Sequence, residues 1–268
     1  MGSPGRATRR ALETALGLTG KDGTRQAWYG IGQSIVLVPF DALVSSTAGP
    51  MLRRSGLDAE KQQQIIVLLI AFLMQSVMTF GILSVSYGVL LLFGFTERES
   101  LSGALALLFA TTVLQYVQSA QENNLLLLLA LVALYSIRHW QKENRASGAA
   151  LAGSACGFAI LVRLPSVLEK AMLFGFAVSA AVRWKQFARA FAPPVVCGFI
   201  VDRWYQWYRF GDVFGTYMGV LGKQARPADA PSSYPFSYPF WEGAWRTLFP
   251  PTNLFFCSIH CSWSWRYS

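Results

Sequence analysis

The chain has 268 residues and a formal net charge of +9, from 23 Lys and Arg residues against 14 Asp and Glu residues. Hydrophobic residues make up 53% of the chain and charged residues only 14%, whereas soluble domains carry about 25% charged residues. This composition argues against a soluble domain, and the scatter of basic residues at the ends of apolar segments argues against nucleic-acid binding.

The N-terminal segment, residues 1–60, is predicted to be extracytoplasmic or interfacial. Residues 12–20 are too short and too polar to form the apolar core of a secretory signal peptide. Residues 30–52 are apolar but contain two prolines and Asp41, a pattern that favours an amphipathic helix lying in a membrane interface. The alternative is that residues 30–52 cross the membrane.

Residues 61–207 are predicted to form a transmembrane bundle of about six helices. The first apolar run, residues 65–93, carries no formal charge. A bilayer core about 30 Å thick needs roughly 20 apolar residues in a helix, and a soluble protein has little reason to make a helix apolar on every face. Five further runs follow, at residues 101–119, 122–139, 147–164, 168–184 and 190–207.

The C-terminal part divides into two predicted segments. Residues 208–240 are predicted to form an extracytoplasmic loop. Residues 241–268 begin as a further transmembrane helix and end in an aberrant tail, which suggests a truncation or a change of reading frame near Phe256. His260 and the two cysteines that flank it supply three ligands at most, one fewer than a structural zinc site needs, so we predict no zinc site there.

The basic breaks between the runs predict the orientation. Residues 138–145 and 183–189 each contain three basic residues, and positive-inside bias places both breaks on the cytoplasmic side. Counting crossings from there places three segments outside: residues 121–124, residues 164–170 and the chain after Tyr208. Residues 1–60 then also lie outside, which predicts either a transmembrane helix upstream of this chain or a crossing at residues 30–52.

Four polar residues near the second break recur at helical spacing: Thr111, Gln115, Gln118 and Glu122. On one continuous helix they would form a single row. One interpretation is a polar face that lines an outer cavity, with Glu122 as a ligand to a sugar, a divalent cation or a partner arginine. The other is a tight hairpin in which amide side chains satisfy the turn backbone.

Two further outer positions have alternative interpretations. Arg163 ends the fourth run, where it either snorkels to lipid headgroups or faces inward and binds a lipid-linked phosphate through its guanidinium fork. The aromatic residues around Tyr205 suit an interfacial aromatic belt. The compact turn from Arg209 to Asp212 suits a carbohydrate or lipid-phosphate site better.

Three segments, in this order, carry a resemblance to a known family. They are Tyr29-Gly-Ile-Gly-Gln33-Ser with the later Pro39, Ala152-Gly with Leu161-Val-Arg163-Leu-Pro165, and Tyr205 to Tyr217 with Leu248-Phe-Pro-Pro251. They are similar to motifs of the polytopic GT-C-type glycosyltransferases that use polyprenyl-phosphate sugars, including the mannosyl- and arabinosyltransferase-like group. The resemblance spans about Gly20 to Phe256, and the chain resembles a member incomplete at both ends.

The resemblance implies an all-α fold, a polytopic transmembrane helix bundle with interfacial helices and an extracytoplasmic loop, in the cytoplasmic (inner) membrane. The implied activity transfers a sugar from a polyprenyl-phosphate donor to a saccharide, lipid or protein acceptor on the outer face. The residues expected to bind substrate are Gln33, Glu122, Arg163, Tyr205 and Arg209.

The family's catalytic carboxylate, a general base in the first outer loop, is expected upstream of this chain. Asp22 is the nearest acid, but its context does not match the motif. The chain also has Pro250-Pro251 where the family has Ser-Pro.

Two other functions remain open. A transporter or flippase for a lipid or small solute would use polar membrane residues in the same way, although residues 65–140 and 147–210 show no internal repeat. The third possibility is an inactive membrane fragment.

Overall fold

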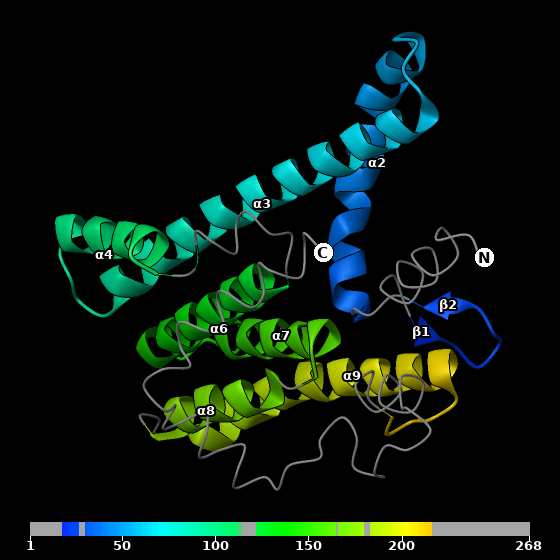
Figure 1. The fold of residues 1–268 in the computed structure, drawn as a ribbon. Coiled ribbons are helices and arrows are strands. Elements are labelled where there is room, and N and C mark those ends of the chain that lie inside the picture. Colours follow the sequence, from blue (N-terminus) through cyan, green and yellow to red (C-terminus); the bar gives the residue numbers. More distant parts are fainter. Residues whose placement is uncertain are drawn as a thin grey trace, which may run out of the picture. The chain divides into compact units, whose positions relative to one another are not determined.

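The computed structural model describes residues 18–26, 30–111, 113, 122–164, 166–179 and 183–215, which form seven helices and one short β-hairpin. In chain order the elements are β1 (Leu18–Thr19), β2 (Arg25–Gln26), α2 (Ile31–Arg54), α3 (Ala59–Leu92), α4 (Glu97–Phe109), α6 (Asn123–Glu143), α7 (Ala146–Val162), α8 (Ser166–Ser179) and α9 (Trp184–Phe210) (Figure 1). Apart from the antiparallel pair β1 and β2, the described residues confirm the predicted all-α class.

Six helices correspond to the six predicted apolar runs, but the second run differs. A capping box starts α4, because the Thr96 hydroxyl accepts from the Glu99 amide and the Glu99 carboxylate accepts from the Thr96 amide. The helix ends at Phe109 after 13 residues, about 20 Å at 1.5 Å per residue. The prediction of one helix over residues 101–119 is therefore wrong.

Two helices, α2 and α3, are long and apolar enough to cross a membrane, and α7 is a shorter apolar helix. The α2 helix continues through Pro39 and Pro50, although each proline removes one backbone donor from the helix. Only four of its 24 residues are buried. Most of its surface is therefore not covered by the other described helices.

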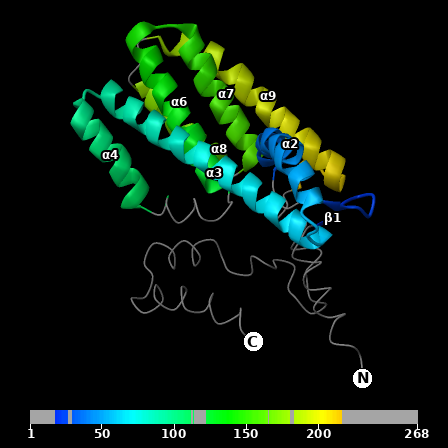
Figure 2. The ribbon, with the colours of Figure 1, turned by 90° about the horizontal axis from the view of Figure 1, so that it is seen from above.

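The α7 helix lies between α6 and α9 (Figure 2). A Cβ atom added to Gly153 would overlap the carbonyl oxygen of Phe191, and one added to Gly157 would overlap that of Pro194. From the opposite side, a Cβ on Gly198 would overlap the carbonyl oxygen of Gly157. The α7 and α9 backbones therefore touch along a pair of glycines four residues apart, the spacing that allows close helix packing in membranes.

Aromatic side chains fill the space at one end of this contact. The ring centroids of Trp140 and Phe187 are 4.7 Å apart, and those of Phe187 and Phe191 are 5.1 Å apart. Phe187 is fully buried. Such tilted and offset pairs add about 0.5–1.5 kcal/mol each beyond the area they bury, so they reinforce the packing of α6 against α9.

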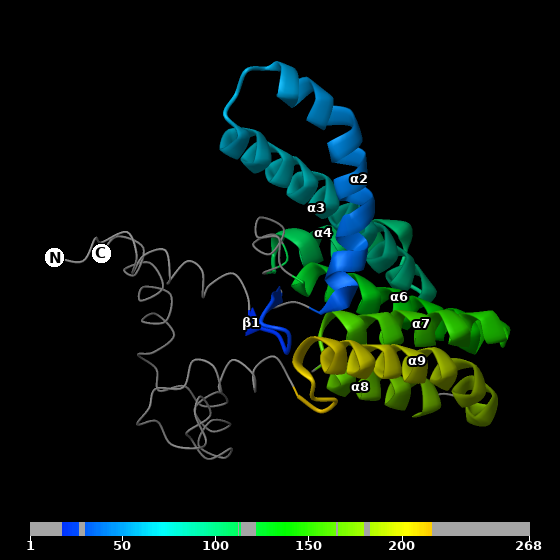
Figure 3. The same cartoon turned by 90° about the vertical axis from the view of Figure 1, so that its right-hand side faces the viewer.

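The α2 helix runs crosswise to α7 and α9 and begins against the last turn of α7 (Figures 1 and 3). A Cβ on Gly30 would overlap the carbonyl oxygen of Leu161, and a Cβ on Gly32 would lie 2.8 Å from the Val162 amide nitrogen. Both glycines are needed for this close approach. The start of α2 is therefore held at the end of α7 where Arg163 follows.

The glycine contact predicts opposite effects for two matched substitutions. Gly157→Ala places a methyl group against the α9 backbone, and we expect destabilisation by about 1–3 kcal/mol. Gly175→Ala, in α8, meets no atom within 4 Å, and we expect stabilisation by about 0.5–1 kcal/mol because helical alanine replaces glycine. Thermal unfolding in detergent measures both, and equal melting temperatures would contradict the contact.

Candidate functional site

Consecutive helices from α6 to α9 alternate in direction, so several helix ends meet at one end of the bundle. There α6 and α8 begin, and α7 and α9 end (Figure 2). We call this the polar end, because it gathers buried or half-buried polar side chains from six helices or their cap residues: Gln33, Gln75, Glu122, Asn124, Arg163, Ser166, Lys170, Asp202, Gln206 and Arg209.

Glu122 and Arg163, two of the predicted substrate-binding residues, form an ion pair. Glu122 is the N-cap residue of α6 and Arg163 is the C-cap residue of α7. The Nη1 atom of Arg163 lies 3.3 Å from Oε1 of Glu122, with the side chains 40% and 15% exposed. Of the alternatives for Glu122, the partner arginine is the one present among the described contacts.

Burial raises the pKa of the Glu122 carboxyl above its ordinary value of 4.5, and the charge of Arg163 offsets part of that rise. A carboxyl with a raised pKa keeps its proton to a higher pH. The ion pair is therefore fully formed only above the raised pKa.

The predicted row of four polar residues does not lie on one helix. Thr111 follows the end of α4, and Glu122 precedes α6. Gln115 and Gln118 lie outside the described residues. Because α4 ends at Phe109, before Thr111, these positions do not share the helix face that the spacing predicted.

A second buried contact joins α3 to α6 beside the ion pair. The Nδ2 atom of Asn124 donates to Oε1 of Gln75 at 3.3 Å, and both residues are buried. Asn124 falls within the predicted outer segment 121–124, whereas Gln75 was not predicted from the sequence. The available signal was a glutamine in the middle of an apolar run.

The first turns of α8 contribute two buried side chains. Ser166 is 7% exposed and Lys170 is 4% exposed, and their spacing of four places them on one helix face. Lys170 pairs with Glu169 at 3.1 Å, whereas the Ser166 hydroxyl has no hydrogen-bond partner among the described residues. Sequence analysis missed both, although a fully buried lysine is rare in proteins.

Four polar residues near the end of α9 are buried, and three of them, Asp202, Gln206 and Arg209, share one face because they are four and three residues apart. Arg203 donates to the Asp202 carboxylate and to the Val213 carbonyl oxygen, which neutralises the acid. The guanidinium carbon of Arg209 lies 5.0 Å from the ring centroid of the predicted site residue Tyr205. Sequence analysis missed Asp202 and Gln206, which this helical spacing would have revealed.

The β1–β2 hairpin packs on the end of α9 (Figure 3). The Lys21 amide donates to the Arg209 carbonyl oxygen at 2.8 Å. Its ammonium lies 4.8 Å from the Trp207 ring centroid and 5.4 Å from that of Tyr208. Gly211, at φ 74°, turns the chain away after α9, in the left-handed region that glycine adopts without strain.

The five predicted substrate-binding residues therefore all lie at the polar end, on or next to α2, α6, α7 and α9. Glu122 with Arg163, and Tyr205 with Arg209, form two contacting pairs. Gln33 is 6% exposed in the first turn of α2. Among the described residues no three His, Cys, Asp or Glu side chains lie close enough to hold a metal ion, and the segment around His260 lies outside those residues.

No family model, curated protein or solved structure matches this chain. The resemblance to GT-C-type glycosyltransferases therefore stays a prediction from the motifs.

The unequal exposure of the Glu122–Arg163 pair predicts unequal effects of removing each partner. Arg163→Met leaves a mostly buried carboxylate without its cation, and we expect destabilisation by about 1–3 kcal/mol at pH 8. Glu122→Gln leaves Arg163 partly in contact with solvent, so the expected loss is under about 1 kcal/mol.

The pH dependence of the free energy of unfolding serves as the control for both variants. Because the folded state holds the Glu122 proton more tightly than the unfolded state, stability falls as pH rises from 4.5 through the raised pKa. Glu122→Gln should remove this fall, and Arg163→Met should enlarge it. Parallel pH profiles of unfolding for wild type and both variants would show that the pair has no such role.

Proposed function

We propose that the chain is a multi-pass membrane glycosyltransferase of the GT-C type. It transfers a sugar from a polyprenyl-phosphate donor to a saccharide, lipid or protein acceptor at the outer face of the membrane. The observation that supports the proposal is a set of hydrogen-bond donors between the end of α7 and the first turns of α8. They are the Arg163 guanidinium, the Ser166 hydroxyl and the Lys170 ammonium.

These three groups suit a phosphate better than a neutral ligand. Nε of Arg163 and Oγ of Ser166 are buried without a hydrogen-bond partner among the described residues, and Nζ of Lys170 has only its ion pair with Glu169. Guanidinium and ammonium groups bind phosphate oxygens through charge-assisted hydrogen bonds. The positive end of the α8 dipole adds to the attraction.

The proposed chemistry uses the same groups in the transition state. The acceptor oxygen attacks the anomeric carbon as the bond from that carbon to the phosphate oxygen breaks. The electron pair and the developing negative charge pass to the polyprenyl phosphate, where fixed cations stabilise them. The acceptor proton goes to a carboxylate general base, as the resemblance to the GT-C-type family implies.

The hairpin supports the proposed topology. If the six predicted runs mark six crossings, with α4 forming only part of the second, residues before α3 and after α9 lie on the same side. The hydrogen bond from Lys21 to Arg209 requires the hairpin to lie on that side too. The α2 helix then does not cross, and its crosswise direction suits a helix in the outer interface (Figure 3).

A flippase for the same lipid is the second candidate. The buried row of Asp202, Gln206 and Arg209 favours it, because charged residues inside membrane helices mark transport paths. The two functions differ in product, since only the transferase releases free polyprenyl phosphate.

The topology has a direct test with single cysteines. In a variant with all four native cysteines replaced by serine, Lys21→Cys and Asp212→Cys should react with a membrane-impermeant maleimide in intact spheroplasts. Lys142→Cys, at the opposite end of the bundle, should react only in inverted vesicles. Reaction of Lys21→Cys and Lys142→Cys from the same side would show that α2 crosses the membrane.

The donor site predicts loss of binding at the polar end alone. Arg163→Gln or Lys170→Gln should weaken binding of a polyprenyl-phosphate sugar by about 10- to 100-fold, since a charged hydrogen bond contributes about 1.5–3 kcal/mol. Binding is measured on purified protein in nanodiscs. The matched control is Arg145→Gln, because Arg145 is 73% exposed at the opposite end of α7.

Lys170→Arg keeps the charge and should keep most of the affinity, which separates loss of phosphate binding from loss of folding. Equal donor affinity in wild type, Arg163→Gln and Lys170→Gln would overturn the proposed site.

A further inference from the structure

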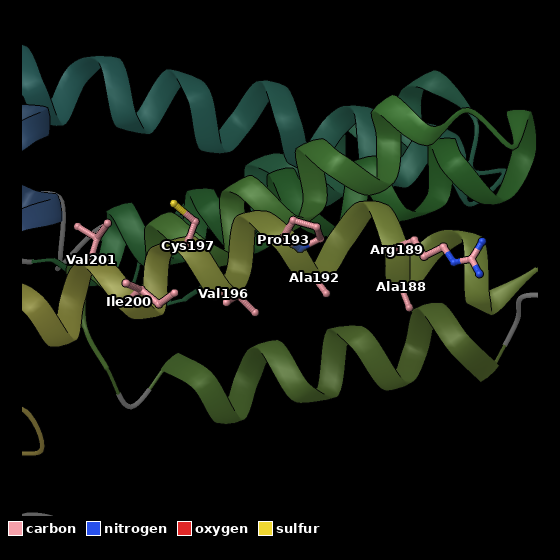
Figure 4. Close-up of a pocket in the computed structure, with 8 residues that line it drawn as sticks. All are labelled: Ala188, Arg189, Ala192, Pro193, Val196, Cys197, Ile200 and Val201. Carbon is pink, nitrogen blue, oxygen red and sulfur yellow. The ribbon is translucent and has the colours of Figure 1, made fainter.

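A groove of about 550 Å³ follows α9 away from the polar end (Figure 4). It is lined by Ala188, Arg189, Ala192, Pro193, Val196, Cys197, Ile200 and Val201. Arg189 is the single charged residue of this lining and lies at the end farthest from Val201 (Figure 4). The groove is therefore apolar along its length and basic at one end.

The basic end continues beyond the groove. Lys185 lies one helical turn before Arg189 on the same row of residues, and Arg183 is the N-cap residue of α9. None of the three has an ion-pair partner within the described part of the chain, and no acidic residue occurs between Glu169 and Asp202 in the sequence. These charges complement an anion rather than another protein side chain.

The apolar part of the groove is open to its surroundings. Val196 is 53% exposed and Ile200 is 60% exposed. Burying apolar surface is favourable by about 25 cal/mol for each Å², so contact with a hydrocarbon chain would stabilise these side chains relative to exposure to water. Pro193 adds no backbone donor that would need a polar partner.

The length of the groove matches one leaflet of a bilayer. From Arg189 to Val201 the helix rises about 18 Å at 1.5 Å per residue. Half of a hydrocarbon core about 30 Å thick is about 15 Å. A lipid with its headgroup at Arg189 would therefore lay its chain along the groove to about the middle of the bilayer.

We infer that the α9 groove binds one anionic phospholipid of the cytoplasmic leaflet. Its phosphate lies on Arg189 and Lys185, and one acyl chain lies over Ala192, Val196 and Ile200. Basic pockets on the cytoplasmic side of membrane helices bind anionic headgroups in this way. This inference rests on the membrane topology of the proposed function but not on the donor site, which lies at the opposite end of the bundle.

Native mass spectrometry of the purified full chain, with phosphatidylglycerol or phosphatidylcholine added, tests the site. We expect at least fivefold tighter binding of phosphatidylglycerol by wild type and a ratio near one for Lys185→Gln/Arg189→Gln. The matched control, Lys142→Gln/Arg145→Gln, removes two cations from the other basic break and should keep the preference. Equal binding of both lipids by wild type, or equal loss in both double variants, would overturn the inference.

Cys197 offers an independent measurement inside the groove, because it is exposed whereas Cys156 is buried. In Cys257→Ser/Cys261→Ser protein, phosphatidylglycerol should slow alkylation of Cys197 at least threefold. Ala192→Trp should abolish the protection by filling the groove without changing its charge. Protection by a polyprenyl phosphate but not by phosphatidylglycerol would assign the groove to the donor lipid and refute this inference.

Donor binding separates the two proposals. Lys185→Gln/Arg189→Gln should bind the polyprenyl-phosphate sugar as wild type does, because these residues lie away from Arg163. A loss of donor binding in that variant would refute separate sites, whereas failure of the Arg163→Gln test alone would refute the donor site and leave the phospholipid site standing.

Discussion

The rest of the structure depends on the backbone contact between α7 and α9. Gly153 and Gly157 let α7 approach the carbonyl oxygens of Phe191 and Pro194 without an intervening side chain. Lipid tails are as apolar as leucine, so helices in a membrane gain little from hydrophobic burial and rely on such close packing. Because the two helices run in the same direction, the contact also brings Arg163 and the end of α9 to one end of the bundle.

The polar end concentrates groups that are costly to bury. Arg203 neutralises Asp202. The attraction of Arg163 compensates only part of the cost of burying the Glu122 carboxylate, so the pKa of Glu122 is raised. In the described part of the chain, Lys170 pairs with one acidic residue, Glu169, whose side chain is 45% exposed. Buried ionisable groups with incomplete partners cluster at functional sites more often than in structural cores. This imbalance, rather than any one residue, favours ligand binding at the polar end.

The helices were predictable from the sequence because apolar length is a local property. Six apolar runs gave six helices, but two runs were predicted too long: the second, because α4 ends at Phe109, and the fifth, because α8 ends at Ser179 and Trp184 already begins α9. The pairing of Glu122 with Arg163 was among the stated alternatives. The burial of Lys170 and Ser166 was missed, because it depends on how α8 packs against its neighbours and leaves no periodic signal in a single helix. The tail after residue 215 lies outside the described residues.

The two ends of α9 differ in how their charged side chains are paired. This difference is relevant to the membrane orientation that we propose for the bundle. At its start three cations have no acidic partner among the described residues, whereas at its end Asp202 and Arg203 pair with each other and Arg209 is buried. Unpaired cations are retained on the cytoplasmic side of membranes, where anionic headgroups stabilise them. A charge that is already neutralised meets less resistance to being placed on the outer side. In the proposed topology, the same charge pattern therefore separates a basic end at the cytoplasmic leaflet from the polar end that we propose binds the donor.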